Sequence, residues 1–161
     1  MGLGGRSFLA TNKMILNSAD FGHNQSIPPR LTCDGTNTGP TLAIEGAPTG
    51  TKAFALIVHD PDAISGDWLH WSVWNIPANT TIFSASQLPQ GCVQGTTDFK
   101  TVGYGGPCPP TGTGTHRYMF ELYALRESLQ LPSGADRTQL ESALAPLTIE
   151  KTILVGLYTR N

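Results

Sequence analysis

The sequence predicts a mostly β protein, a β-sandwich formed by a single domain over residues 1–161 with one or two short helices. The length of 161 residues suits one domain with its own core. Only 14% of the residues are charged, whereas 18 glycines and 12 prolines are spread along the whole chain. Turn-forming residues at this density indicate many short strands. Apolar runs with a period of two support the same fold class.

Four strands are predicted in the first half of the chain. Short strands at 14–21 and 41–44 flank a turn-rich segment. The segment 53–60 alternates, with Phe54, Leu56 and Val58 on one face. The next apolar run, 69–76, is rich in residues that favour strands and ends at a proline.

The second half is predicted to hold two strands and one helix. Residues 79–94 carry no clear pattern and are expected to be irregular. The segment 103–115 is a loop, because its prolines lack N–H donors and its glycines lose too much entropy in regular structure. A strand follows at 117–125, and another closes the chain at 152–158.

Between those strands, Asp136 is the expected N-cap of a helix. Gln139 stands at the capping-box position three residues later. Leu140, Ala143, Leu144 and Leu147 form the apolar stripe of this helix.

Charge and hydropathy exclude several classes of function. The net charge is −2 and the ten basic residues are scattered, so a nucleic-acid partner is not expected. No apolar run is long enough to span a bilayer, so no transmembrane segment is expected. The first ten residues lack a secretory signal pattern, and residues 1–12 are expected to be a loosely ordered lead-in.

The three cysteines, Cys33, Cys92 and Cys108, are far apart in the sequence. An odd count without a secretory signal is typical of reduced thiols in the cytoplasm, where we expect this protein. One disulfide among them stays open as an alternative. Their spacing does not suit a zinc site.

Two carboxylates stand at the end of a predicted strand, in Asp60-Pro61-Asp62. The proline holds Asp60 in an extended conformation, so both carboxylates can lie on one side of the chain. Strand ends are common places for binding sites. The alternative is a turn in which each carboxylate accepts hydrogen bonds from nearby backbone.

A second polar group surrounds the Pro/Gly loop. His116 and Tyr118 are two residues apart at a strand start and so share a face. The loop before them can offer backbone N–H groups to an anion. His70, beside a tryptophan, is either a functional residue or a packed core histidine. His23 and His59 are expected to be structural or exposed.

Several motifs, in order over nearly the whole chain, resemble the phosphatidylethanolamine-binding protein family. They are Leu31-Thr32-Cys33-Asp34-Gly35, Asp60-Pro61-Asp62-Ala63, Trp68-Leu69-His70-Trp71, Asn75-Ile76-Pro77, Gly106-Pro107-Cys108-Pro109-Pro110-Thr111-Gly112 and His116-Arg117-Tyr118-Met119-Phe120. The branch that this chain resembles is the bacterial and archaeal one, which is described as similar to Raf kinase inhibitor proteins. Ile64 departs from the family pattern, which usually has proline there, and we expect no counterpart of the long C-terminal helix of animal members.

The resemblance implies an antiparallel Greek-key β-sandwich with an anion pocket. Carried over by position, the ligand-binding residues are Asp60, Asp62, Trp68, His70, Gly106, Pro107, Cys108, His116 and Tyr118. The implied ligand is phosphate, acetate or a phospholipid headgroup, and the implied protein partner is a kinase or a protease that the protein would modulate.

The expected function is therefore non-catalytic anion binding, without a cofactor, by a monomer or homodimer. The two carboxylates would orient the histidines and loop amides, and phosphate should bind more tightly at mildly acidic pH. The alternative is a metal-dependent hydrolase that uses Asp60, Asp62, His70 and His116. It lacks a recognisable ligand spacing and a separate nucleophile.

Overall fold

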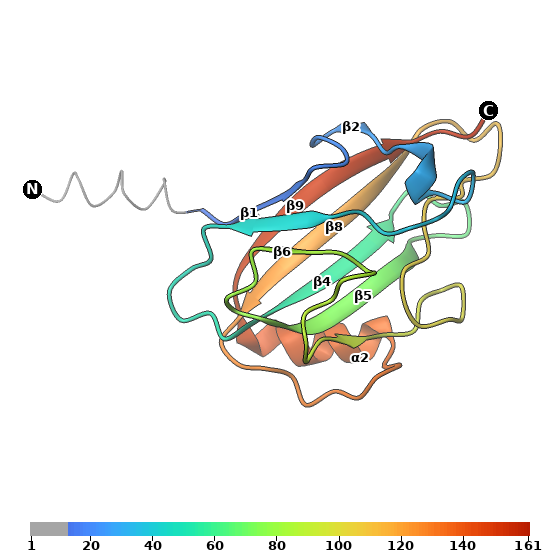
Figure 1. Cartoon of the computed structure of the whole chain (residues 1–161). Coiled ribbons are helices and arrows are strands. Elements are labelled where there is room, and N and C mark those ends of the chain that lie inside the picture. Colours follow the sequence, from blue (N-terminus) through green and yellow to red (C-terminus); the bar gives the residue numbers. More distant parts are fainter. Residues whose placement is uncertain (1–12) are drawn as a thin grey trace, which may run out of the picture.

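The computed structural model describes residues 13–161, which form two β-sheets and one α-helix (Figure 1). The smaller sheet has the strand order β1-β3-β6 and the larger one β2-β9-β8-β4-β5-β7. The strands are β1 (Ile15–Ser18), β2 (Gln25–Ser26), β3 (Leu42–Glu45), β4 (Ala53–Asp60), β5 (Trp68–Pro77), β6 (Ile82–Phe83), β7 (Val93–Gln94), β8 (His116–Leu125) and β9 (Thr148–Tyr158). The helix is α2 (Arg137–Leu144), and short 3-10 helices span Pro29–Leu31 and Ala145–Leu147.

The larger sheet is covered on both faces, which gives the molecule three layers. One core lies between the two sheets and includes Phe54, Leu56 and Val58 from one face of β4. The other lies under α2 and includes Ala55 and Ile57 from the opposite face. All eight residues of β4 are therefore buried, and the predicted shared face of this strand is confirmed.

The strands of the larger sheet are antiparallel, with one short exception. β2 pairs in parallel with β9 over two residues. The segment 79–94, expected to be irregular, contributes β6 and β7, each of two residues. Such short pairings carry no periodicity that a sequence pattern could reveal. The expected lead-in at 1–12 lies outside the described residues.

The helix begins where the capping signal predicts. The Asp136 side chain accepts a hydrogen bond from the Gln139 N–H at 2.8 Å, and the Gln139 side chain accepts one from the Asp136 N–H at 2.9 Å. Leu140 and Leu144 point into the core under the sheet. Local sequence thus determines the start of α2, and burial of its apolar stripe holds it.

Removing this cap gives the first testable prediction. Asp136→Ala should lower the free energy of unfolding by about 1 kcal/mol, because the Gln139 N–H loses its acceptor. Urea unfolding followed by circular dichroism measures it. Glu127→Ala is the control, since this exposed side chain makes no hydrogen bond within residues 13–161 and should change stability by less than about 0.5 kcal/mol. An equal effect of both substitutions would contradict the capping role.

The expectation that all three cysteines are reduced thiols is wrong for two of them. Cys33 and Cys108 form a disulfide across 75 residues of sequence, with Cα atoms 5.4 Å apart. The loop 103–115 lies beside the residues that follow the 3-10 helix Pro29–Leu31. The contact between them is the hydrogen bond that the Cys33 N–H donates to the Pro107 carbonyl at 3.1 Å. This approach is tertiary, so cysteine spacing could not reveal it. Cys92 remains a free thiol, and burial raises its pKa to about 11.

Candidate functional site

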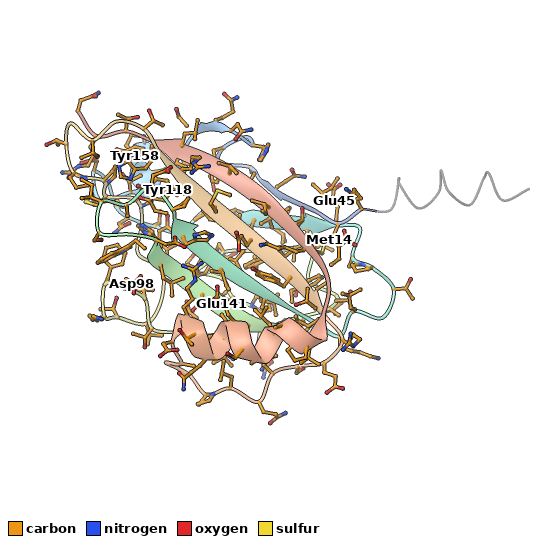
Figure 2. All side chains as sticks on the ribbon, turned by 180° about the vertical axis from the view of Figure 1, so that it is seen from behind. Met14, Glu45, Asp98, Tyr118, Glu141 and Tyr158 are labelled. Atoms are coloured by element: carbon orange, nitrogen blue, oxygen red, sulfur yellow. A yellow bond between two sulfur atoms is a disulfide. The ribbon has the colours of Figure 1, made fainter. Side chains whose placement is uncertain are left out.

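A cavity of about 390 Å³ opens at one end of the sandwich. β4 ends at Asp60, β5 begins at Trp68 and β8 begins at His116, and antiparallel pairing brings these three points together. In Figure 2, Tyr118 lies toward this end with Tyr158, whereas Met14 and Glu45 lie toward the other. The cavity therefore sits where three central strands begin or end, as strand-end sites commonly do.

Asp60 and His116 form the base of the cavity. Both are buried, and the His116 Nδ1 lies 2.7 Å from the Asp60 Oδ2. The other ring nitrogen, Nε2, lies 2.9 Å from the Thr113 hydroxyl. The second Asp60 oxygen accepts the N–H of Asp62 at 2.7 Å, so this aspartate also makes the expected backbone turn contact. Asp60 thus orients His116, which is the role we expected of the carboxylates.

His70 forms one side of the cavity and is held by the loop. Its Nδ1 lies 2.7 Å from the Gly105 carbonyl, which can only accept, so this nitrogen donates. Burial lowers the pKa of His70 below its usual 6.5, which keeps the ring neutral. The Nε2 of a neutral ring with this tautomer is an acceptor. His70 therefore offers the cavity an acceptor, not the positively charged donor that we expected.

Tyr118 lies between the two histidines. Its ring meets the His70 ring edge-on, with the ring centroids 5.2 Å apart. It stacks with the His116 ring, with the ring centroids 6.5 Å apart. Burial, together with the charge of Asp60 and a hydrogen bond to it, raises the pKa of Tyr118. The phenol therefore stays protonated and can donate a hydrogen bond.

Asp62 is the predicted site residue that turns away. Its carboxylate accepts two hydrogen bonds from the Arg117 guanidinium, both at 2.9 Å, and it does not line the cavity. Arg117 lowers the pKa of Asp62 to about 2. The pair fastens the turn after β4 to the start of β8, so Asp62 supports the cavity from outside.

Of the three predicted site residues in the loop, only one lines the cavity. Cys108 lines the cavity, whereas Gly106 and Pro107 do not. The Gly106 N–H donates to the Asn37 side chain at 2.9 Å, and a side chain on Gly106 would meet the Leu31 carbonyl oxygen at 2.3 Å. Pro107 has no N–H. The loop therefore supplies fewer amides than expected, and within residues 13–161 the Cys108 N–H is still without an acceptor.

An apolar wall completes the cavity. Trp68, the predicted rim residue, lines the cavity. Its ring packs edge-on against that of Phe99, with the ring centroids 5.5 Å apart. The lining residues that the sequence did not reveal are Ala63, Ile64, Ser65, Phe99, Pro109 and Pro110. Ile64 is the residue that stands where the family pattern usually has proline. The role of Phe99 could not be predicted. It comes from the segment between β7 and the loop 103–115, which has no periodic pattern of apolar residues.

The arrangement does not favour a metal. Within residues 13–161 no three His, Cys, Asp or Glu side chains are grouped to hold an ion. The four residues of the hydrolase alternative do not all meet, since Asp62 binds Arg117. Asp60, His70 and His116 are arranged as hydrogen-bonding groups at a mostly apolar cavity, which suits binding of a small ligand with a polar end.

The other two histidines lie away from the cavity. The His23 Nδ1 accepts the Val155 N–H at 3.1 Å. His59 is buried between Asp67 and Glu121 on the face of the sheet under α2. Both have structural roles, as expected.

Comparison with known proteins places the chain among relatives. The family model described as phosphatidylethanolamine-binding protein matches residues 17–159. The UPF0098 protein PH1269 of Pyrococcus horikoshii is 44% identical over 149 residues, which cover 89% of this chain and 75% of that protein.

Two solved structures have the same fold. Escherichia coli YbcL, described as a new member of the mammalian PEBP family, matches with a TM-score of 0.87 and 32% identity over 92% of this chain and 99% of its own. A Chlamydia trachomatis homologue, CT736, matches with a TM-score of 0.87 and 33% identity over 93% of this chain and 99% of its own.

Proposed function

The chain belongs to the phosphatidylethanolamine-binding protein family, and from this premise we propose that its cavity binds a phosphate group non-catalytically. Family membership supports a role as a binding protein in general. The phosphate is either free or part of a phospholipid headgroup, and both present charged oxygen atoms to the cavity. Only free phosphate also carries a P–OH group, so the test begins with inorganic phosphate. The observation that carries the proposal is the convergence of Asp60, His70, His116 and Tyr118 in one cavity.

The hydrogen-bonding groups of the cavity fit an anion that still holds a proton. A phosphate oxygen can accept from the Cys108 N–H, and from the Tyr118 phenol if that proton turns from Asp60 to the ligand. Both ring nitrogens of His116 already have partners, so this residue shapes the cavity and does not serve as a free donor. A P–OH group can donate to the Nε2 of His70, which burial keeps neutral. Asp60 repels a bare anion, but each of its carboxylate oxygens already has a hydrogen-bond partner, in His116 and in the Asp62 N–H, which reduces that repulsion.

Titration calorimetry with inorganic phosphate tests the proposal. Tyr118→Phe removes one donor from the cavity and should weaken phosphate binding about tenfold. Tyr123→Phe is the matched control, because Tyr123 packs on the other face of the sheet and should leave binding unchanged. No measurable phosphate binding by the wild-type protein would refute the proposal.

The pH dependence of binding is a separate prediction. Phosphate should bind more tightly near pH 5.5 than near pH 8, because the singly charged dihydrogen form, with two P–OH groups and less repulsion from Asp60, becomes more abundant. Burial lowers the pKa of His70, which favours the neutral ring that accepts from such a P–OH group. Sulfate has no proton to donate at either pH and should bind more weakly than phosphate. Calorimetry at both pH values measures this difference. An unchanged affinity for phosphate would contradict the prediction.

The partner, the oligomeric state and the location remain predictions. A kinase or protease partner that depends on the cavity should be captured by the wild-type protein and lost with His116→Ala.

Within residues 13–161 no helix is long and apolar enough to cross a membrane. The cytoplasmic expectation depended on reduced cysteines, and the disulfide favours a compartment in which such bonds persist.

A further inference from the structure

We propose that the Cys33–Cys108 disulfide places ligand binding in the cavity under redox control, so that reducing the bridge weakens binding. The proposal rests on the proposed function, because it concerns the regulation of the same cavity. It is carried by the position of the bridge, by its exposure and by the scarcity of other bonds that hold this part of the wall.

The bridge forms part of the cavity wall. Cys108 lines the cavity together with its neighbours Pro109 and Pro110. Cys33 lies outside the cavity, just after the 3-10 helix Pro29–Leu31. Both cysteines are exposed, so a reductant in solution can reach the sulfur atoms. Exposed disulfides are those that tend to be labile and regulatory.

Apart from the bridge, the wall segment 108–111 is held mainly from within its own loop, where the Pro110 carbonyl accepts from the Thr113 N–H at 3.3 Å and from the Thr113 hydroxyl at 2.7 Å. Before it, the Gly105 N–H donates to the His70 carbonyl at 2.9 Å and the Pro107 carbonyl accepts from Cys33. After it, the Gly112 N–H donates to the Arg160 carbonyl at 3.3 Å. Between these points, the described residues show no backbone hydrogen bond to another segment. Pro109 and Pro110 have no N–H to donate.

The chemistry is a thiol–disulfide exchange with a dithiol, either a small molecule or a protein. One thiolate of the dithiol attacks a sulfur of the bridge, the S–S bond breaks, and a mixed disulfide forms. The second thiol then displaces the remaining cysteine. Two electrons and two protons pass to Cys33 and Cys108, and the dithiol leaves as a disulfide.

Reduction then lets segment 108–111 move, so the wall and the Cys108 N–H occupy the binding geometry for only part of the time. Apparent affinity falls in proportion to the fraction of molecules with the wall in place. A fraction near one tenth gives about a tenfold loss. Because such coupling is reciprocal, bound ligand must resist reduction of the bridge by the same factor.

The experiment uses the full chain with Cys92→Ala, which removes the free thiol and so prevents exchange within the protein. Calorimetry with inorganic phosphate compares this protein before and after reduction with dithiothreitol. The reduced form should bind about tenfold more weakly. Saturating phosphate should also raise, by about the same factor, the ratio of reduced to oxidised dithiothreitol that half-reduces the bridge. Cys33→Ser, which leaves Cys108 in the wall, should match the reduced form.

The outcomes separate the two proposals. Equal affinity of the oxidised and reduced forms would overturn redox control and leave phosphate binding intact. No phosphate binding by the oxidised protein would refute the proposed function, and redox control with it. Loss of the native far-UV circular dichroism spectrum on reduction would also overturn redox control, because the bridge would then hold the whole fold and not the cavity wall.

Discussion

Glu121→Ala is expected to lower the free energy of unfolding by about 3 kcal/mol near pH 5.5, because it breaks a buried ion pair. The Glu121 carboxylate accepts from the His59 ring at 3.0 Å and from the Tyr123 phenol at 2.8 Å. The other ring nitrogen of His59 lies 2.7 Å from Asp67. Since both partners of the ring are carboxylates, both nitrogens donate and the ring is positively charged. Without Glu121 this buried charge keeps only Asp67, at the more exposed end of the ring.

The pH dependence of this effect follows from two opposing shifts. Burial opposes the charge of Glu121, but the hydrogen bonds from His59 and Tyr123 outweigh it and lower the pKa of Glu121 from 4.5 to about 2. Its contribution to stability is therefore present above about pH 4.5 and is lost as the pH falls toward 2. Burial likewise opposes the charge of His59, but Glu121 and Asp67 raise its pKa above 6.5. That contribution is present below about pH 6.5 and is lost as the pH rises through the folded-state value.

Urea unfolding of the wild-type protein and Glu121→Ala at about pH 5.5 and pH 9 measures this effect. The difference in stability should be largest at the lower pH. Glu141→Ala is the control, because its pair with Arg137 is half exposed and should contribute less than about 0.5 kcal/mol. A Glu121 effect that is as small as the Glu141 effect, or larger at pH 9, would contradict the prediction.

Trp71→Ala is expected to lower the free energy of unfolding by about 4 kcal/mol. Trp71 is fully buried between the two sheets, and its indole N–H donates to the Gln94 side chain at 2.7 Å. Its ring contacts Phe83 and Tyr104, so truncation opens a large cavity and leaves the Gln94 oxygen without its donor.

Trp68→Ala provides the comparison on the same strand. Trp68 is only half-buried at the rim of the ligand cavity, so its removal should cost less stability than that of Trp71. Both variants are measured by urea unfolding under the same conditions. Equal losses of stability would contradict the prediction. They would mean that burial between the sheets does not determine how much stability a tryptophan on β5 contributes.

The central strands could be predicted because their signal is local. β4 has the bounds expected for 53–60, and β5 and β8 differ from the predicted 69–76 and 117–125 by one residue at an end or at both. Alternation along each strand identified these segments, and the capping pair of Asp136 and Gln139 located the helix. The weaker N-terminal segment 14–21 was predicted too long, since β1 is Ile15–Ser18.

The candidate site was predictable in part, for a related reason. Asp60, His70, His116 and Tyr118 each stand at or near a strand end, which could be seen in the sequence, and all four line the cavity. Asp62 has the same local setting as Asp60, yet it is drawn outward by Arg117. The protonation of His70 was also unpredictable, because it depends on burial against the loop.

The fold class, the central strands, the helix start and the polar residues that could form a site can all be predicted from the order of the amino acids. The Cys33–Cys108 bridge, the place of Phe99 in the cavity wall and the pairing of His59 with Glu121 become visible only in the folded chain. Strand and helix patterns arise between residues a few positions apart, so they are visible in the chain. The other contacts join residues tens of positions apart, and they form only when strand register and loop path bring those residues together.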